Sequence, residues 1–142
     1  MNKTEILQFL NSHPVCFLAT VEGDQPRVRG MMMYRADENG LLFHSGTPKD
    51  VCRQLARNPK VELCFNDMQT RVQIRVAGTA LPDEDQKLKE EIVQAREFLK
   101  PIVAAHGYGV LKVFRVTGCY AAVWTFERNS APKEWVPITV PA

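Results

Sequence analysis

Short runs in which hydrophobic and polar residues alternate recur along the chain and predict β-strands joined by tight turns. The clearest is residues 71–77, RVQIRVA, where β-branched residues alternate with two arginines and a glutamine. Side chains in a strand point to opposite faces in turn, so this run predicts one buried and one polar face. Further strands are expected at 15–21, 27–34, 41–45 and 61–65, and a long β segment at 110–126 is either two strands or one strand bent near Gly118.

Three segments between these strands have the periodicity and the end signals of helices. They lie at 4–12, at 47–57 and from 82 to about 99. Thr4 and Thr47 are expected to cap the first two, and Pro101 kinks or ends the third. The third helix carries an apolar stripe made of Leu88, Ile92, Ala95 and Leu99.

Six or seven strands with only three helices between them do not follow the regular alternation of a doubly wound parallel sheet. The order favours an α+β fold, mainly β, in which an antiparallel barrel has helices packed at its side. A length of 142 residues fits one domain covering 1–142. Its last part, 127–142, contains three prolines and is expected to be an irregular extension.

Composition narrows the function classes. The formal net charge of +2 is too small to argue for nucleic acid, and no apolar run approaches the roughly 20 residues that cross a bilayer. The N-terminus shows no apolar signal segment, so a cytoplasmic protein without a membrane partner is expected. Neither the three histidines nor the four cysteines have metal-ligand spacing, so no metal is expected and the thiols are interpreted as reduced core residues.

One strand–turn–helix segment carries candidate chemistry. Residues 41–59, LLFHSGTPKDVCRQLARNP, place Ser, Gly, Thr and Lys where a strand ends and a helix begins. Backbone N–H groups at a helix start carry partial positive charge and bind phosphate. Arg29 and Lys49 are candidate cations for that phosphate, and Ser45 is a candidate hydroxyl donor. Thr47 is either another donor or a plain helix cap.

The ordered set of an EGDQP turn, the strand RVRGMMMY, the segment above and the strand RVQIRVAGTA resembles the pyridoxamine-5'-phosphate oxidase-like FMN-binding split barrels. The resemblance covers 15–80 well and 113–124 more loosely. It implies a six-stranded antiparallel split β-barrel, Greek-key-like, with flanking helices. It also implies a homodimer that holds FMN at the subunit interface.

The same resemblance implies which positions contact the cofactor. The expected FMN-binding residues are Arg29, Gly30, Met31, Met32, Met33, Tyr34, His44, Ser45, Lys49, Gln73 and Trp124. Each has a structural alternative. Gly30 could mark a β-bulge, the three methionines could be core and dimer packing, and Gln73 could be an ordinary solvated residue. His44 is either structural, a proton donor or a heme ligand.

The sequence also departs from the oxidase proper. Asp50 and Val51 stand where the oxidase has two basic residues, and Tyr34 stands where it has a lysine. The substrate-binding C-terminal segment of the oxidase has no match in 127–142. The sequence therefore predicts an FMN-dependent oxidoreductase that is not a true pyridoxamine phosphate oxidase, with an unknown small-molecule substrate. A non-catalytic FMN or heme module for storage or sensing is the alternative, and a structural dimer that has lost its cofactor is a third.

Overall fold

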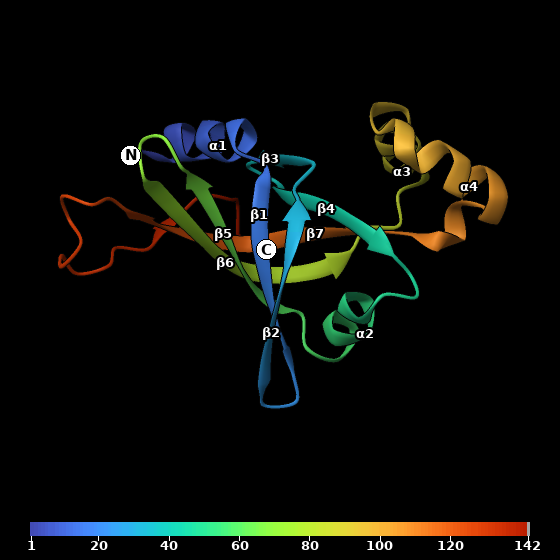
Figure 1. The fold of residues 1–142 in the computed structure, drawn as a ribbon, viewed down its shortest axis with the longest axis horizontal. Coiled ribbons are helices and arrows are strands. Elements are labelled where there is room, and N and C mark those ends of the chain that lie inside the picture. The colour runs from blue at the N-terminus through green and yellow to red at the C-terminus, as the bar shows by residue number, and fades with distance from the viewer. Residues whose placement is uncertain (142) are drawn as a thin grey trace.

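The framework of the protein is one eight-stranded antiparallel sheet (Figure 1), seen in a computed structural model that describes residues 1–141. Its strands are β1 (Val15–Glu22), β2 (Gln25–Met32), β3 (Arg35–Asp37), β4 (Gly40–Gly46), β5 (Lys60–Asp67), β6 (Val72–Pro82), β7 (Leu111–Trp124) and β8 (Val136–Pro137). They follow the order β2-β1-β5-β6-β7-β4-β3, and β8 pairs with β7. The α+β class expected from the sequence is confirmed.

The expectation of a six-stranded split barrel is wrong, because the sheet has eight strands and is open. Strands β2 and β3 form its two ends, and no ladder joins them within residues 1–141. The predicted strand 27–34 ends at Met32, and only Met33 and Tyr34 connect it to β3. The N–H groups of these two residues donate to Pro14 O (2.8 Å) and Leu42 O (2.7 Å), so the connection crosses between the sheet ends without forming a ladder.

Six helical segments flank the sheet. They are α1 (Lys3–Ser12), α2 (Asp50–Arg57), α3 (Gln86–Ala95), the 3-10 turn η1 (Glu97–Leu99), α4 (Lys100–His106) and the 3-10 turn η2 (Tyr108–Val110). Asn2, rather than Thr4, caps α1, because its side chain and that of Glu5 form a reciprocal capping box. Helix α2 begins at Asp50 rather than Thr47, because the Thr47 N–H donates to Val110 O of η2 and the Lys49 N–H donates to Gly46 O at the end of β4.

The predicted long helix after β6 is broken at Arg96, which has the extended angles φ −121° and ψ 92°. Helix α3 therefore stops at Ala95, and Pro101 falls near the start of the separate helix α4. Three of the four stripe residues are buried, but Ala95 is exposed and Val93 is buried in its place. The break gives an arm of three short helical segments that stands beside the end of β4 (Figure 1).

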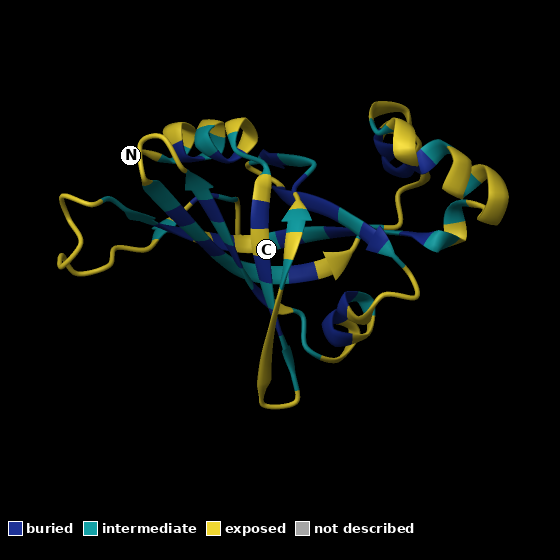
Figure 2. Cartoon of the chain, in the orientation of Figure 1, coloured by how far each residue is buried: buried dark blue, intermediate teal, exposed yellow. Residues whose placement is uncertain are grey.

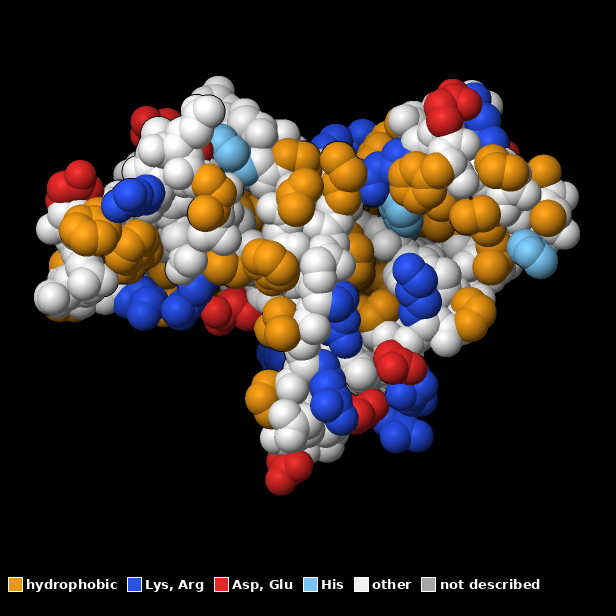
Figure 3. Space-filling view, viewed as in Figure 1, with side chains coloured by type: hydrophobic (Ala, Val, Ile, Leu, Met, Phe, Trp, Pro, Cys, Tyr) orange, Lys and Arg blue, Asp and Glu red, His pale blue; other side chains and the backbone are white. Residues whose placement is uncertain are grey.

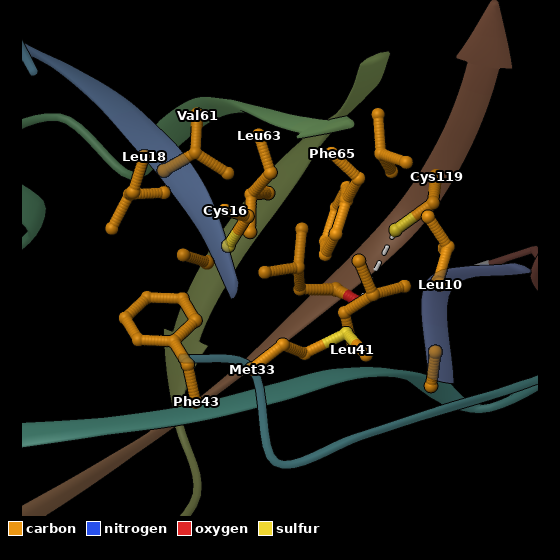
Figure 4. Packing of buried hydrophobic residues seen from close by; sticks show 14 of the residues in the cluster. Leu10, Cys16, Leu18, Met33, Leu41, Phe43, Val61, Leu63, Phe65 and Cys119 are labelled. Atoms are coloured by element: carbon orange, nitrogen blue, oxygen red, sulfur yellow. Dashed lines mark hydrogen bonds between the residues drawn. The ribbon is translucent and has the colours of Figure 1, made fainter. Parts of the chain in front are cut away.

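The main core lies on the concave side of the curled sheet. Alternate residues of β1, β5 and β6 fill it together with α1 and α2, as the buried bands of Figure 2 show. Figure 4 shows Met33 entering this core beside Leu41 and Phe43. A second cluster joins the arm to β4 and β7 through Leu88, Ile92, Leu99 and Leu42. The arm is thus fixed to the sheet by apolar packing along one side.

The C-terminal segment returns to the sheet. After an irregular stretch, β8 pairs with β7, and the Ile138 N–H donates to Cys119 O at 3.0 Å. Ile138 is completely buried, so the expected irregular extension includes one anchored piece. No helix within residues 1–141 has the length and apolar character needed to span a membrane.

Strand β7 is one continuous strand that bends at Gly118, where φ is +60°, opposite a register shift between Ala77 and Thr79 of β6. At this bulge the two strands approach so closely that a side chain on Gly78 has no room. A Cβ atom there would lie 2.7 Å from Val116 Cγ1 and 2.9 Å from Thr117 O. Because one of these atoms is backbone, a small rotamer change cannot relieve the contact.

We therefore expect Gly78→Ala to lower the free energy of unfolding by about 1–3 kcal/mol through overpacking. Chemical denaturation followed by circular dichroism measures this change. Gly30→Ala is the matched control, because a Cβ atom at Gly30 would have no atom within 4 Å and its φ is not positive. Equal stability of the two variants would contradict the close approach at the bulge.

Candidate functional site

A cavity of about 780 Å³ opens between the β1–β2 hairpin, the end of β4 and the start of α2. We call it the basic cavity; its lining residues include Arg27, Arg29, Gly30, Met31, His44, Ser45, Lys49, Arg53 and Gln54. Four cations and the two carboxylates of Glu22 and Asp50 line it, so its net charge is positive. Figure 3 shows lysine and arginine side chains gathered along the hairpin and beside α2.

Arg29 is held in this cavity by neutral acceptors alone. Its Nη1 donates to Thr20 Oγ1 (2.7 Å) and Leu18 O (3.3 Å), and its Nη2 donates to the side chain of Gln54. Burial lowers the pKa of the guanidinium, but arginine remains charged at physiological pH. Within residues 1–141 no carboxylate forms an ion pair with Arg29. The positive charge is therefore positioned but not neutralised.

The acceptors that hold Arg29 are themselves fixed. Thr20 and Gln54 are almost fully buried, and the Thr20 hydroxyl donates to Gln54 Oε1 at 2.6 Å. Glu22 is kept apart from Arg29, because its two carboxylate oxygens accept from Arg27 (3.0 Å) and Arg53 (3.2 Å). The strand pairing and α2 thus present the guanidinium in one orientation.

The start of α2 adds further positive potential. Lys49 occupies the cap position without a side-chain cap bond, and it forms no ion pair within the described chain. Asp50 and Val51 also line the basic cavity, and no backbone carbonyl outside α2 within residues 1–141 accepts from their N–H groups. Free N–H groups at a helix start attract anions. The carboxylate of Asp50 instead pairs with Arg53 at 3.2 Å.

A second, mostly apolar cavity of about 310 Å³ adjoins the first and lies under η1 and α4. We call it the apolar cavity; it is lined by Met31, Met32, Phe98, Leu99, Ile102, Val103, Val110 and Leu111, with Arg96 as a further cation. The two cavities share Gly30, Met31, His44, Ser45 and Lys49. Together they form one groove with a basic end and an apolar end.

His44 stands at the boundary between the two cavities. Its Nε2 lies 2.7 Å from Arg96 Nη1, which can only donate, so we assign the proton of the neutral imidazole to Nδ1. Burial, and then the charges of Arg96 and Lys49, lower the pKa of His44 from 6.5 to about 4. The imidazole therefore stays neutral around pH 7.

The structure brings together six of the eleven residues that the sequence nominated. Arg29, Gly30, Met31, His44, Ser45 and Lys49 all line the basic cavity. Met32 lines the apolar cavity only. Met33 and Tyr34 reach neither: Met33 is buried in the core, and the Tyr34 hydroxyl donates to Glu91 of α3.

Gln73 and Trp124 lie elsewhere on this chain. They pair with each other across β6 and β7 and line a separate cavity of about 400 Å³ under the C-terminal loop. Gln73 donates to Asn66 Oδ1 at 2.9 Å, and Trp124 donates to Asn129 Oδ1 at 3.0 Å. Within one protomer, therefore, these two residues are not part of the groove.

Sequence reasoning missed Arg96, Gln54 and Thr20. Arg96 was assigned to the helix expected from 82 to about 99. Only the interruption of that helix turns Arg96 toward His44 and toward the carbonyls of Met32 and Met33. Gln54 and Thr20 gave no signal either, because a polar residue in an amphipathic helix or a strand is normally solvated. Their burial is visible only in three dimensions.

The protein is of the α+β class, with an open antiparallel sheet and a groove with a positively charged end beside a short helix. The family model for Pyridoxamine 5'-phosphate oxidase matches residues 3–116. The chain belongs to that family, which confirms the resemblance drawn from the sequence motifs.

Relatives and solved structures agree with this assignment. A pyridoxine/pyridoxamine 5'-phosphate oxidase of Rhodopseudomonas palustris (strain TIE-1) is 44% identical over 69 residues, which are 48% of this chain and 32% of the relative. A Bradyrhizobium oxidase is 36% identical over 87 residues, 61% of this chain and 38% of the relative. The chain thus spans about a third of the length of the curated relatives it matches. A crystal structure of a NimC/NimA family protein from Clostridium acetobutylicum is 28% identical with a TM-score of 0.77, covering 96% of this chain and 93% of that one.

The depressed pKa of His44 can be measured directly. We expect an NMR titration of the imidazole to show it neutral down to about pH 4, and Arg96→Met to raise its pKa toward 6.5. Because the folded pKa lies below the unfolded one, the unfolded state binds the proton first. The free energy of unfolding should therefore decrease as the pH is lowered from 6.5 to about 4. His44 should contribute nothing to the pH dependence of stability above that range. A wild-type imidazole that titrates near 6.5 would contradict the burial of His44 beside Arg96.

Proposed function

We propose that the protein binds FMN in the groove and is a flavin-dependent oxidoreductase other than a pyridoxamine phosphate oxidase. The observation that carries the proposal is the pair of cations, Arg29 and Lys49, left without carboxylate partners at the basic end. Two unpaired cations beside a helix start suit a phosphate dianion. Family membership supports the same choice of ligand.

The residues present fit the two parts of FMN. Arg29, Lys49, Ser45 and the first N–H groups of α2 would hold the phosphate. At Gly30 the backbone is open, since a Cβ atom there would have no atom within 4 Å, so a flat ring can approach the strand. Met31 offers a polarizable thioether on the wall that the two cavities share.

The same arrangement explains how the site could hold a phosphate although Asp50 and Val51 stand where the oxidase has two basic residues. Asp50 points its carboxylate to Arg53, whereas no backbone carbonyl outside α2 within residues 1–141 accepts from its N–H group or from that of Val51. The backbone at these positions can therefore supply hydrogen-bond donors where side-chain cations are lacking.

When bound, FMN supplies the redox chemistry by exchanging electrons or a hydride with a substrate. The chain's own residues bind and orient it. His44 presents a neutral imidazole with its proton on Nδ1, and the apolar residues under α4 limit the access of water to that end of the groove. No group in the groove is positioned as a nucleophile, so the protein's part is binding, orientation and access.

The non-catalytic alternative has one observation in its favour. His44 lines both cavities of the groove, and its pKa of about 4 leaves it unable to donate a proton near neutral pH. An FMN carrier or sensor needs no such group. Bleaching of the bound flavin by NADH or NADPH, followed by reoxidation with an acceptor, would favour the enzyme.

A heme module has less support, because Arg96 already occupies His44 Nε2.

We also propose a homodimer formed through the convex face of the sheet. Val15, Phe17, Val28 and Met32 are between 51% and 68% exposed, although all four are apolar and lie on paired strands. Contiguous exposed apolar patches of this kind mark interaction sites. The strand register continues this face through β5 to Gln73 and Trp124, so a partner packed on it could contribute these two residues to a shared site. Separately from the dimer, we propose that the protein is cytoplasmic.

The phosphate site predicts how FMN and riboflavin differ. We expect the double variant Arg29→Met/Lys49→Met to weaken FMN binding by at least about a hundredfold, since each charge-assisted contact contributes ~1.5–3 kcal/mol. Riboflavin, which lacks the phosphate, should bind the variant and the wild type alike. Flavin fluorescence quenching measures both affinities.

Arg27→Met is the matched control, because Arg27 lines the same cavity but is paired with Glu22. It should lose much less affinity than the double variant. Unchanged FMN binding by the double variant would contradict the assigned phosphate site.

The dimer proposal predicts the effect of a charge on the convex face. Phe17→Lys should convert the dimer to a monomer, because it places an uncompensated charge within the apolar interface. Light scattering coupled to size-exclusion chromatography measures the mass. Met68→Lys, at a residue 84% exposed in the β5–β6 turn, should remain dimeric. A wild-type monomer would refute the dimer, and a dimeric Phe17→Lys would exclude this face as its interface.

A further inference from the structure

The apolar cavity has a cation of its own, separate from the phosphate site. Arg96 lies at the break between α3 and η1 and lines this cavity, but it does not line the basic cavity. A charged group next to a mostly apolar wall is costly unless something compensates it. The contacts of Arg96 therefore show what kind of ligand this end of the groove can accept.

Arg96 is fixed through neutral acceptors and keeps donors to spare. Its Nη1 donates to Met32 O (3.1 Å) and to His44 Nε2 (2.7 Å), and its Nη2 donates to Met33 O (3.0 Å). A guanidinium has five N–H donors. The Nε–H and one N–H of Nη2 thus have no acceptor within residues 1–141.

No carboxylate of the described chain neutralises Arg96. Two acids on the flanking helical segments are paired elsewhere: Glu91 of α3 accepts from the Tyr34 hydroxyl (2.5 Å) and from Arg35 (2.9 Å), and Glu97 of η1 pairs with Lys100 (2.8 Å). Tyr34 contributes only its ring, whose centroid lies 5.4 Å from the Arg96 guanidinium carbon. Lys49 is the other charged residue of this cavity and has the same sign. The field at this end therefore favours a negative charge on a ligand.

We propose that the apolar cavity binds a small apolar carboxylate, whose carboxyl group meets the free donors of Arg96 and whose hydrocarbon body packs against Phe98, Ile102 and Val110. The inference that this ligand is the substrate rests on the proposed function. The inference that the ligand binds in this cavity does not. A cavity of about 310 Å³ suits a body of one or two rings. The fork of an arginine matches the two oxygens of a carboxylate.

The chemistry favours a carboxylate over a second phosphate ester. Two spare N–H groups on one guanidinium satisfy a carboxylate, whereas a phosphate dianion brings three oxygens and needs more donors. The residues that η1, α4 and η2 contribute to this cavity are apolar, and its other side-chain donors, on Lys49 and Ser45, lie on the wall that it shares with the basic cavity. The basic cavity, with its two unpaired cations, Arg29 and Lys49, and the helix start, is the better site for a dianion. The groove thus separates the two anions.

Calorimetric titration with 2-naphthoate and with its neutral analogue 2-naphthamide tests the proposal, using the full chain with and without bound FMN. We expect 2-naphthoate to bind both forms and 2-naphthamide to bind at least about tenfold more weakly. Arg96→Met should abolish that preference, and Arg57→Met, at an exposed arginine that lines neither cavity, should leave it unchanged.

A second variant covers the case in which loss of Arg96 disturbs its neighbours. Ile102→Trp should fill the apolar cavity and prevent 2-naphthoate binding while keeping Arg96 and its contacts, because Ile102 is 42% exposed and tolerates a larger side chain. Equal affinity for naphthoate and naphthamide, binding unaffected by Ile102→Trp, or displacement of naphthoate by FMN would each overturn the inference. Naphthoate binding that depends on Arg96 in a protein that does not bind FMN would uphold it and refute the flavin proposal instead.

Discussion

The site depends on a positive charge that the protein positions but does not neutralise. Arg29 could have paired with Glu22, which lines the same cavity, but Arg27 and Arg53 occupy both oxygens of that carboxylate. A hydroxyl, an amide oxygen and a backbone carbonyl hold Arg29 instead. These neutral contacts fix the direction of the guanidinium and leave its charge for an external anion.

The fold produces the groove from parts that are distant in sequence. The β1–β2 hairpin supplies Arg29 and Gly30, the end of β4 supplies His44 and Ser45, and the turn after β4 supplies Lys49. The helical arm after β6 forms the apolar end of the groove, because the interruption of the helix at Arg96 turns η1 and α4 back over β4. The same break brings a second cation to the groove. Each end therefore has its own charge and its own wall chemistry.

Local sequence signals were sufficient where the site is local. The turn and helix start after β4, with Ser45 and Lys49, can be recognised because strand ending, turn residues and helix start follow one another in the chain. Arg29 could be nominated from its place on a neighbouring strand. Met33 and Tyr34 were nominated with it through the family resemblance, which placed the contacting strand on residues 29–34, whereas β2 ends at Met32 and no local signal marks where pairing to β1 ends.

Other features depend on long-range packing and could not be predicted from the sequence. The open sheet follows from a two-residue connection that bonds to Pro14 and Leu42. The interruption at Arg96 is stabilised by His44 and by strand carbonyls more than fifty residues away. The buried partners of Arg29, Thr20 and Gln54, come from a strand and a helix 34 residues apart. Patterns of hydrophobic residues contain no information about such polar contacts.

A crystal structure of the protein grown with FMN is the most direct test of the central claim. The account predicts a phosphate oxygen within hydrogen-bond distance of the Arg29 guanidinium and of the first N–H groups of α2, while Thr20 and Gln54 keep their present contacts. A phosphate bound elsewhere, or an Arg29 paired with a carboxylate of its own chain, would contradict it.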